Sequence, residues 1–327
     1  MIRLSIVLGL TCFALLAISA LAGTAPLSLG ETFAALTGHG NEGVRTIVWE
    51  IRLPRAVAAF SVGAALGLAG AAMQGLLQNP LAEPGVLGVS AFASLGAVVA
   101  IYFGLAGAGT LGVPIAAILF SLVAVAVLMI AAGRGANSVT LLLVGIGLSS
   151  FAGALMALAL NLAPNPWSLA DLINWMLGSV ANRSWTDIGM MTPAWAAGAV
   201  AIFLSAPGLR ALTLGDEIAA TLGVDPVRTR WLVVAGTSLL AGASVAVAGT
   251  IGFVGIVAPH LMRPLVKHDP ARLLLTSALL AGALLLGADL VARLLPFQQE
   301  LKLGVAAALF GAPVFIWIAA RIGSLGR

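Results

Sequence analysis

Long apolar runs recur along the whole chain and constrain its fold more than any other feature. Nine of them are bounded by charged residues, proline or asparagine, and they lie near residues 4–24, 55–77, 86–106, 111–132, 139–160, 187–205, 231–250, 272–293 and 303–320. The hydrocarbon core of a bilayer is about 30 Å thick, and a helix needs roughly 20 apolar residues to cross it. A tenth, shorter run at 251–266 is interrupted by Pro259. We therefore expect an all-α, polytopic membrane protein of about ten transmembrane helices, forming a single permease domain over residues 1–327.

Composition excludes an ordinary soluble protein. Hydrophobic residues make up 61% of the 327 residues and charged residues only 9%, whereas a soluble domain carries about 25% charged residues. The formal net charge of +4 would suggest nucleic-acid binding in a soluble protein, but basic residues in a membrane protein set its orientation. We expect a lipid bilayer and no nucleic acid among the partners.

The distribution of basic residues predicts the orientation. With the N-terminus inside, ten of the sixteen Lys and Arg residues fall in cytoplasmic segments. The remaining six fall outside, and they are Arg45, Arg52, Arg55, Arg183, Arg293 and Lys302. The positive-inside rule then places both termini in the cytoplasm. The first run could instead be a signal peptide, although its apolar stretch is longer than a usual signal core.

A weak internal repeat links the second and seventh runs. Gly63-Ala64 and Ala69-Gly70 recur at the same spacing as Gly242-Ala243 and Ala248-Gly249. Five spans separate the two copies, and this odd number predicts an inverted repeat, as in many transporters. The alternative is chance, because the chain contains 39 glycines.

The sequence lacks the motifs of several catalytic classes. Neither lysine, Lys267 or Lys302, belongs to a phosphate-binding Gly-x-x-x-x-Gly-Lys-Ser/Thr loop, so we expect no ATP hydrolysis by this chain. The three histidines show no ligand spacing with one another or with the single cysteine, Cys12, which predicts no metal site and no cofactor. Any metal cargo is expected to travel inside an organic chelate.

A cytoplasmic stretch at 214–223 is predicted to form a short amphipathic helix that could bind a soluble partner. Two acidic residues oppose the positive N-terminal dipole, and a glycine stands where a left-handed C-cap would lie. Ile218 and Leu222 lie four apart on one face and suit a groove on another protein. The alternative is a capped connector on the membrane surface. The candidate docking residues are Asp216, Glu217, Ala219, Ala220 and Gly223.

Three arginines are predicted on the outer side. Arg52 and Arg55 stand three apart around Pro54, and Arg293 ends the ninth span. Their guanidinium groups suit capture of an acidic protein, although such arginines are also common interfacial anchors. Asp289 is a candidate for proton transfer, but Arg293 one turn later is expected to neutralise it.

One side of the second span carries Gly63, Gly67, Gly70, Gln74 and Gln78. The glycines are expected to permit close helix packing. The two glutamines need polar company, which predicts a pore-facing or interhelical position.

Several of these stretches together resemble the FecCD-type permease family of ABC importers for iron-siderophore, haem and cobalamin. They are Arg52-Leu-Pro-Arg55 and the segments 63–90, 214–223, 252–263 and 288–293. The resemblance implies a homodimer or paired permease in the bacterial inner membrane. It also implies two cytoplasmic ATP-binding subunits, which use the ATP, and a periplasmic substrate-binding protein.

The resemblance also implies roles for particular residues. Residues 206–228 become the coupling segment, and the three outer arginines meet acidic residues of the binding protein. Asn79 with Leu81 lies at the cytoplasmic gate, and the neighbourhood of Ser138 and Val139 resembles a second gate segment. The segment 298–304 departs from the family pattern because it lacks a proline before the tenth span.

Two other functions stay open at this stage. A secondary transporter would need Asp289 for coupling to protons or sodium, and a purely structural membrane subunit would leave the arginines and the short helix without a role. The sequence does not choose among siderophore, haem and cobalamin.

Overall fold

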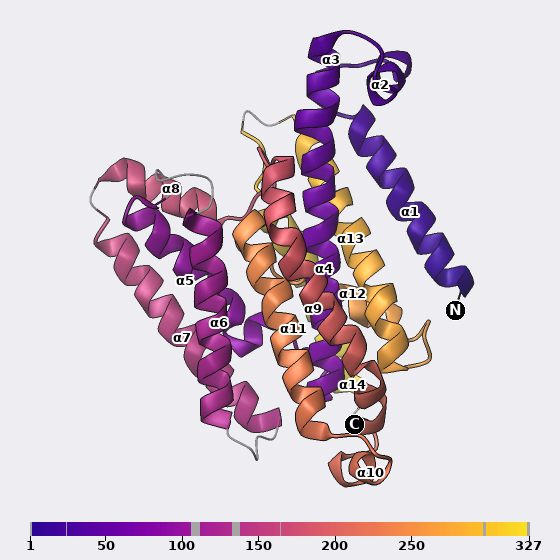
Figure 1. Ribbon diagram of the computed structural model, residues 1–327, viewed down its shortest axis with the longest axis vertical. Helices are drawn as coiled ribbons and strands as arrows, with labels where there is room; N and C mark the ends of the chain where they lie inside the picture. The colour runs from indigo at the N-terminus through magenta and orange to yellow at the C-terminus, as the bar shows by residue number, and fades with distance from the viewer. Residues whose placement is uncertain are drawn as a thin grey trace.

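The computed structural model of the protein describes residues 2–23, 25–105, 112–132, 138–163, 165–296 and 299–325. Over these residues the structure contains helices and no strand (Figure 1). Each of the ten apolar runs contains one helix: α1 Ile2–Leu21, α4 Leu53–Leu77, α5 Val89–Tyr102, α6 Gly112–Ala132, α7 Ser138–Asn161, α9 Trp185–Leu212, α11 Pro226–Ala248, α12 Val254–Met262, α13 Pro270–Leu294 and α14 Leu303–Leu325. The all-α, polytopic fold class is therefore confirmed.

The helices differ in their capacity to cross a bilayer. In the described part of the chain six helical segments are long and apolar enough to span one, and they contain α1, α4, α7, α9, α11 and α13. Shorter apolar helical stretches lie in α5, α6 and α14, at Val89–Tyr102, Gly112–Leu128 and Leu303–Ile316. The irregular tenth run forms α12, which has only nine residues.

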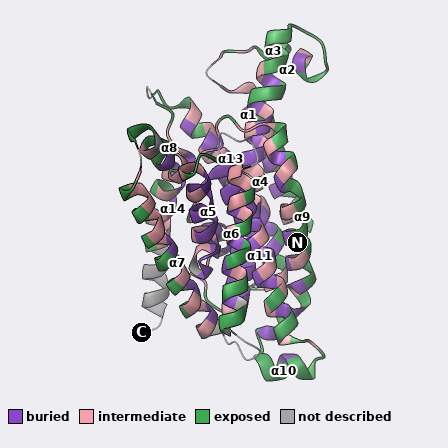
Figure 2. Cartoon of the chain, turned by 60° about the vertical axis from the view of Figure 1, so that its left-hand side comes forward, coloured by how far each residue is buried: buried purple, intermediate pink, exposed green. Residues whose placement is uncertain are grey.

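Helix α4 forms the centre of the bundle and packs against α9, α11, α12 and α13. Figure 2 shows the buried residues gathered along the inner helices and the exposed ones on the outer faces. A Cβ at Gly70 would overlap the backbone carbonyl of Gly255 in α12. Only glycine permits this approach, which confirms the packing role predicted for the small residues of α4.

The packing of α4 and α11 agrees with the predicted inverted repeat. Gly63 in α4 lies against Ala281 and Gly282 of α13, and Gly242 in α11 lies against Ser121 of α6. Helices α13 and α6 occupy the ninth and fourth apolar runs, again five apart. Equivalent glycines thus contact equivalent helices, as an inverted repeat requires.

The segment 25–54 is more helical than its composition predicts. Residues 38–42, Gly-His-Gly-Asn-Glu, are typical of a loop, but the segment folds into α2 (Leu29–Leu36), α3 (Glu42–Thr46) and the π-helix η1 (Ile47–Arg52), which continues into α4. Ser28 and Glu31 form a reciprocal capping box at the start of α2, a local signal that composition overlooks. The π-turn also accommodates Pro54, which lacks an N–H for the regular α-helical ladder.

Two further short helices have bounds that differ from the sequence expectation. The sequence after Pro164 and Pro166 predicts a short helix over 169–180. The structure has α8, Pro166–Met176, which begins on a proline suited to a first turn and ends before Gly178 at φ 70°. The expected helix 214–223 is α10, Asp216–Thr221. It lies at the opposite end of the bundle from α2 and α3 (Figure 1).

Candidate transport and docking sites

Two non-helical segments meet inside the bundle. Helix α11 ends at Ala248, and residues 249–253 are irregular before α12 begins; Phe253 has φ 66°. Helix α4 likewise ends at Leu77, and residues 78–83 are irregular before the 3-10 helix η2, Pro84–Leu87. The two segments lie against each other, because a Cβ added to Gly255 would stand 3.5 Å from Pro84 Cδ.

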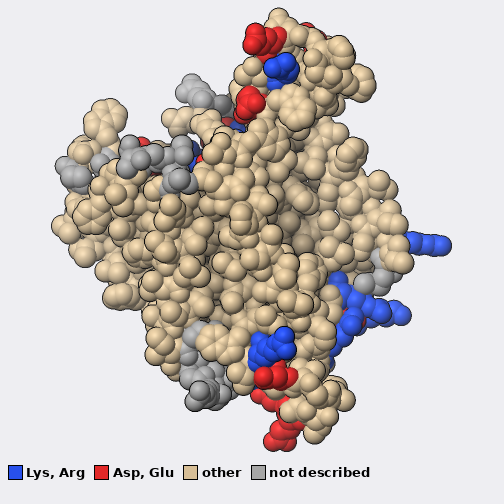
Figure 3. Space-filling view, viewed as in Figure 1, with Lys and Arg blue, Asp and Glu red and all other residues tan. Residues whose placement is uncertain are grey.

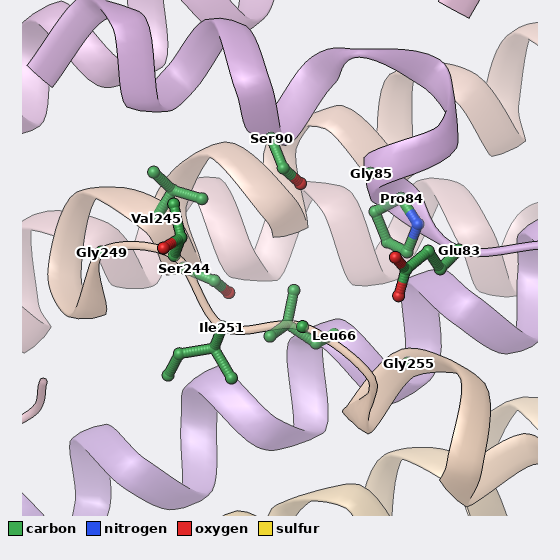
Figure 4. A pocket seen from close by; sticks show the side chains of 12 residues that line it. Leu66, Glu83, Pro84, Gly85, Ser90, Ser244, Val245, Gly249, Ile251 and Gly255 are labelled. Carbon is green, nitrogen blue, oxygen red and sulfur yellow. The ribbon is translucent and has the colours of Figure 1, made fainter. Parts of the chain in front are cut away.

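A cavity of about 170 Å³ lies where these segments meet. Figure 4 shows Glu83 and Pro84 on one side, Ser244 and Ile251 on the other, and Leu66 of α4 nearby. Broken helices at such a place characterise the binding regions of several transporter folds. Sequence reasoning missed Glu83, although Pro80, Pro84 and the glycines at 249, 252 and 255 mark both breaks.

Gln74 takes the interhelical position that was one of its two predicted alternatives. It is buried, its Nε2 donates to the Gly255 carbonyl at 3.5 Å, and Arg263 donates to its Oε1. Gln78 adopts φ 51° and bonds only the backbone of its own helix, Nε2 to the Gly75 carbonyl at 2.6 Å.

The candidate gate residues occupy the ends of two helices. Asn79 is exposed just after α4, and its Oδ1 accepts from the Leu81 backbone N–H at 2.9 Å. This bond closes a tight turn from Asn79 to Leu81. Ser138 begins α7, and Val139 beside it is largely exposed.

Helix α10 offers an exposed apolar surface. Ile218 and Leu222 are 50% and 61% exposed, and Ala220 is also exposed. Ala219 is fully buried in the core, so its assignment to the docking face is wrong. Ala219 stands about 100° around the helix from Ile218 and packs into the core of the bundle.

The polar residues around α10 fix its position. Asp216 and Glu217 occupy the first turn, and Asp216 forms an ion pair with Arg230 of α11. Gly223 follows the helix with φ 79° and has nothing within 4 Å of an added Cβ. It is therefore a left-handed C-cap whose conformation favours glycine, as the sequence predicted.

The structure brings the three outer arginines together but turns them inward. Arg52 is only 3% exposed and donates to the backbone carbonyls of Ala20, Leu21 and Ala25. The expectation of a freely exposed guanidinium is wrong for this residue. Its bonds instead hold the end of α1 against η1 and α4.

The other two arginines share one buried carboxylate. Arg55 donates to Asp289 Oδ1 at 2.8 Å through Nη2 and at 3.0 Å through Nε, and Arg293 Nε lies 3.1 Å from Asp289 Oδ2. Asp289 is 1% exposed. The predicted pairing of Asp289 with Arg293 is confirmed, and Arg55 adds a second cation that the sequence did not reveal.

A second cavity opens beside these arginines. It has a volume of about 350 Å³ and is lined by Arg52, Arg55, Arg293 and Glu300, with Ile51 and Leu295 among its apolar residues. Arg55 also bonds Glu300, with Nη1 donating to Oε2 at 3.1 Å. The site can therefore hold a carboxylate from outside the fold.

The end of the bundle that carries α10 has its own ionic cluster. Arg210 donates to both oxygens of Asp269 at 2.9 Å, and Arg272 Nε lies 3.0 Å from Asp269 Oδ2. Partial burial raises the pKa of the Asp269 carboxyl, but the bonds from Arg210 and from the amides of Arg272 and Ala271 outweigh this effect and lower it below its ordinary value. Figure 3 shows acidic and basic side chains at the top and bottom of the molecule, further basic side chains along its right-hand edge, and a broad surface without charged side chains elsewhere in this view.

Comparison with known proteins assigns the family. A model of the FecCD transport family matches residues 10–321. The chain is 40% identical over 302 residues to the uncharacterized ABC transporter permease protein YvrB of Bacillus subtilis, covering 91% of this chain and 85% of that protein. It is 41% identical over 278 residues to the vitamin B12 import system permease protein BtuC of Vibrio cholerae, covering 84% and 83%.

A solved structure shows the same architecture. A transporter described as being of the metal-chelate type, in an inward-facing conformation, superposes with a TM-score of 0.89 at 28% identity. The match covers 98% of this chain and 100% of that chain. The chain therefore belongs to the FecCD transport family and is a membrane-spanning permease of the ABC importer type.

Proposed function

We propose that this protein carries a large metal chelate inward across the bacterial inner membrane. The supporting observation is the 41% identity to the vitamin B12 permease of Vibrio cholerae over most of both chains. Cobalamin is therefore the first candidate substrate, and an iron-siderophore or haem is the alternative. The permease performs no covalent chemistry in this proposal. Cytoplasmic ATP-binding subunits hydrolyse the ATP, and a periplasmic binding protein delivers the chelate.

Uptake by a reconstituted complex tests the substrate. The permease is combined in proteoliposomes with its ATP-binding and substrate-binding partner proteins, and uptake of labelled cobalamin, ferric siderophore and haem is compared. We expect ATP-dependent uptake of cobalamin. Uptake of only the ferric siderophore or only haem would make that chelate the substrate in place of cobalamin. ATP-independent uptake of all three would reject the proposal of an ATP-driven importer.

We also propose that two permease chains enclose the path. Helix α7 exposes Leu143 and Phe151, and α14 exposes Leu309 and Phe310. These faces provide apolar surface either for lipid or for a second copy. A homodimer, or a pair with a related permease, would place the apolar walls that a large chelate needs between the chains.

The ATPase is proposed to bind α10 through Ile218 and Leu222. Replacing Gly223 with Val forces a β-branched residue to φ 79°, which costs about 1–3 kcal/mol and should displace the helix. We expect less ATPase to copurify while membrane insertion persists. Gly223→Asn is the matched control because asparagine tolerates the left-handed region. Equal copurification of both variants with the parent would place the ATPase elsewhere.

The cytoplasmic gate is proposed at Asn79 and Leu81, with Ser138 and Val139 as a second segment. A bulky apolar residue at a narrow point can keep a closed pore dry. Leu81→Cys in a Cys12→Ser background should crosslink between two chains in one nucleotide state only. Crosslinking that is independent of nucleotide would remove Leu81 from the gate.

A further inference from the structure

The charges around Arg55 do not balance. Three guanidinium groups line or adjoin the cavity of about 350 Å³, from Arg52, Arg55 and Arg293. Two carboxylates, from Asp289 and Glu300, form ion pairs with these groups. Among the described residues of this site one positive charge is therefore left over, and Arg52 satisfies its donors with neutral carbonyls alone.

The two carboxylates differ in how firmly they are held. Asp289 lies on α13, is 1% exposed, accepts hydrogen bonds from Arg55 and forms an ion pair with Arg293. Glu300 is 38% exposed on its side chain and stands in the non-helical segment 299–302; among the described residues its carboxylate pairs with Arg55 alone. A buried pair is costly to break, whereas an exposed pair contributes little to stability. Glu300 is thus the carboxylate that can leave.

The segment that carries Glu300 leads directly into α14. The Gly304 backbone N–H donates to the Gly178 carbonyl at 3.1 Å. A Cβ at Gly304 would also meet the carbonyls of Leu177 and Thr250, and Thr250 belongs to the break between α11 and α12. Residues 299–302 are therefore tied to Arg55 at one end and to the interior of the bundle at the other.

We propose that Glu300 is an internal competitor for the outer docking site: its carboxylate occupies the position on Arg55 that an acidic side chain of the binding protein takes on docking. The exchange of one carboxylate for another keeps Arg55 paired and releases residues 299–302 at the start of α14. This inference rests on the proposed docking of a binding protein at this end of the bundle. It adds a residue that sets the affinity of that docking.

Two charge-neutralising variants separate competition from general electrostatics. Glu300→Gln removes the internal competitor, and Glu42→Gln, on exposed α3 at the same end, removes the same charge without contact with Arg55. Association with the binding protein is measured on the reconstituted complex at low and high salt. We expect Glu300→Gln to tighten binding about fivefold, which corresponds to about 1 kcal/mol. Glu42→Gln should stay within about twofold of the parent, since an isolated surface charge contributes little.

The outcomes distinguish the competitor from the docking itself. Weaker binding by Glu300→Gln, or equal tightening by both variants, would overturn the role of Glu300. Absence of any association by the parent would instead reject the docking proposal on which it rests.

A second measurement reports on the segment directly. In a Cys12→Ser background, Leu301→Cys should react faster with a membrane-impermeant maleimide once the binding protein is added. In combination with Glu300→Gln, it should react fast from the outset. A labelling rate in the parent background that does not change with binding protein would overturn the release of 299–302.

Discussion

At the scale of single residues, Asp269 combines two roles that substitution can separate. Its Oδ1 accepts from the Ala271 and Arg272 amides at 3.0 and 3.2 Å and so caps α13, and the same carboxylate pairs with Arg210. Asparagine caps helices as well as aspartate does. We therefore expect Asp269→Asn to cost up to about 1 kcal/mol of stability, the range of an exposed ion pair. Asp269→Ala should cost about 1 kcal/mol more through the lost cap.

The ionic part of this stability should depend on pH. Because the folded-state pKa of Asp269 lies below its ordinary value, the carboxylate stabilises the fold above the unfolded pKa, near 4. This contribution is lost as pH falls through the folded pKa. Unfolding in detergent should show parent and Asp269→Asn differing at pH 7 and converging in strong acid. A constant difference across that range would show that the ion pair contributes nothing.

The sequence predicted which residues gather at the outer site better than it predicted where their side chains point. The sequence indicated that Arg52, Arg55 and Arg293 share one end of the bundle, and it paired Arg293 with Asp289. It could not show that Arg52 points inward, because that depends on the unpaired carbonyls that end α1. Nor could spacing reveal the bond between Arg55 and Glu300, which lie 245 residues apart.

At the scale of helices, the contact of α4 with α12 depends on Gly70. Its Cα faces the Gly255 backbone so closely that a methyl group would overlap it. We expect Gly70→Ala to destabilise the protein by about 1–3 kcal/mol, the usual cost of overpacking. Gly189→Ala in α9 is the control, because nothing lies within 4 Å of its added Cβ. Thermal unfolding in detergent measures both, and equal midpoints would show that the two helices separate freely.

Helix positions followed from the length of the apolar runs, while the breaks depended on backbone chemistry. Runs of about twenty apolar residues located nine of the helices because a bilayer fixes their length. The run 251–266 was recognised as irregular from Pro259, yet the break falls earlier, at 249–253. Glycine at 249 and the positive φ of Phe253 permit it, and residues 83–85 of another segment line the same cavity. Such a long-range partner has no local signal.

At the scale of the whole molecule, the fold was predictable from the sequence. The orientation of the protein in the membrane remains a prediction. Alternating helices place Arg45, Arg52 and Arg293 at the end that carries α2 and α3, and α10 at the other (Figure 1). Ten basic residues against six predict that the α10 end is cytoplasmic. The inverted repeat does not decide which end faces the cytoplasm, because its symmetry exchanges the two ends of the bundle.

Site-directed labelling tests the orientation with one internal cysteine removed. Cys12 is buried, and its Sγ donates to the Leu279 carbonyl at 3.3 Å, so Cys12→Ser should retain that bond and the fold. In this background His39→Cys lies between α2 and α3, and Glu217→Cys lies in α10; both positions are exposed. In spheroplasts an impermeant maleimide should label residue 39 at once and residue 217 only after the membrane is permeabilised. The reverse pattern would place α10 outside and exclude it as the ATPase site, and labelling of both in intact spheroplasts would contradict a bilayer between the two ends.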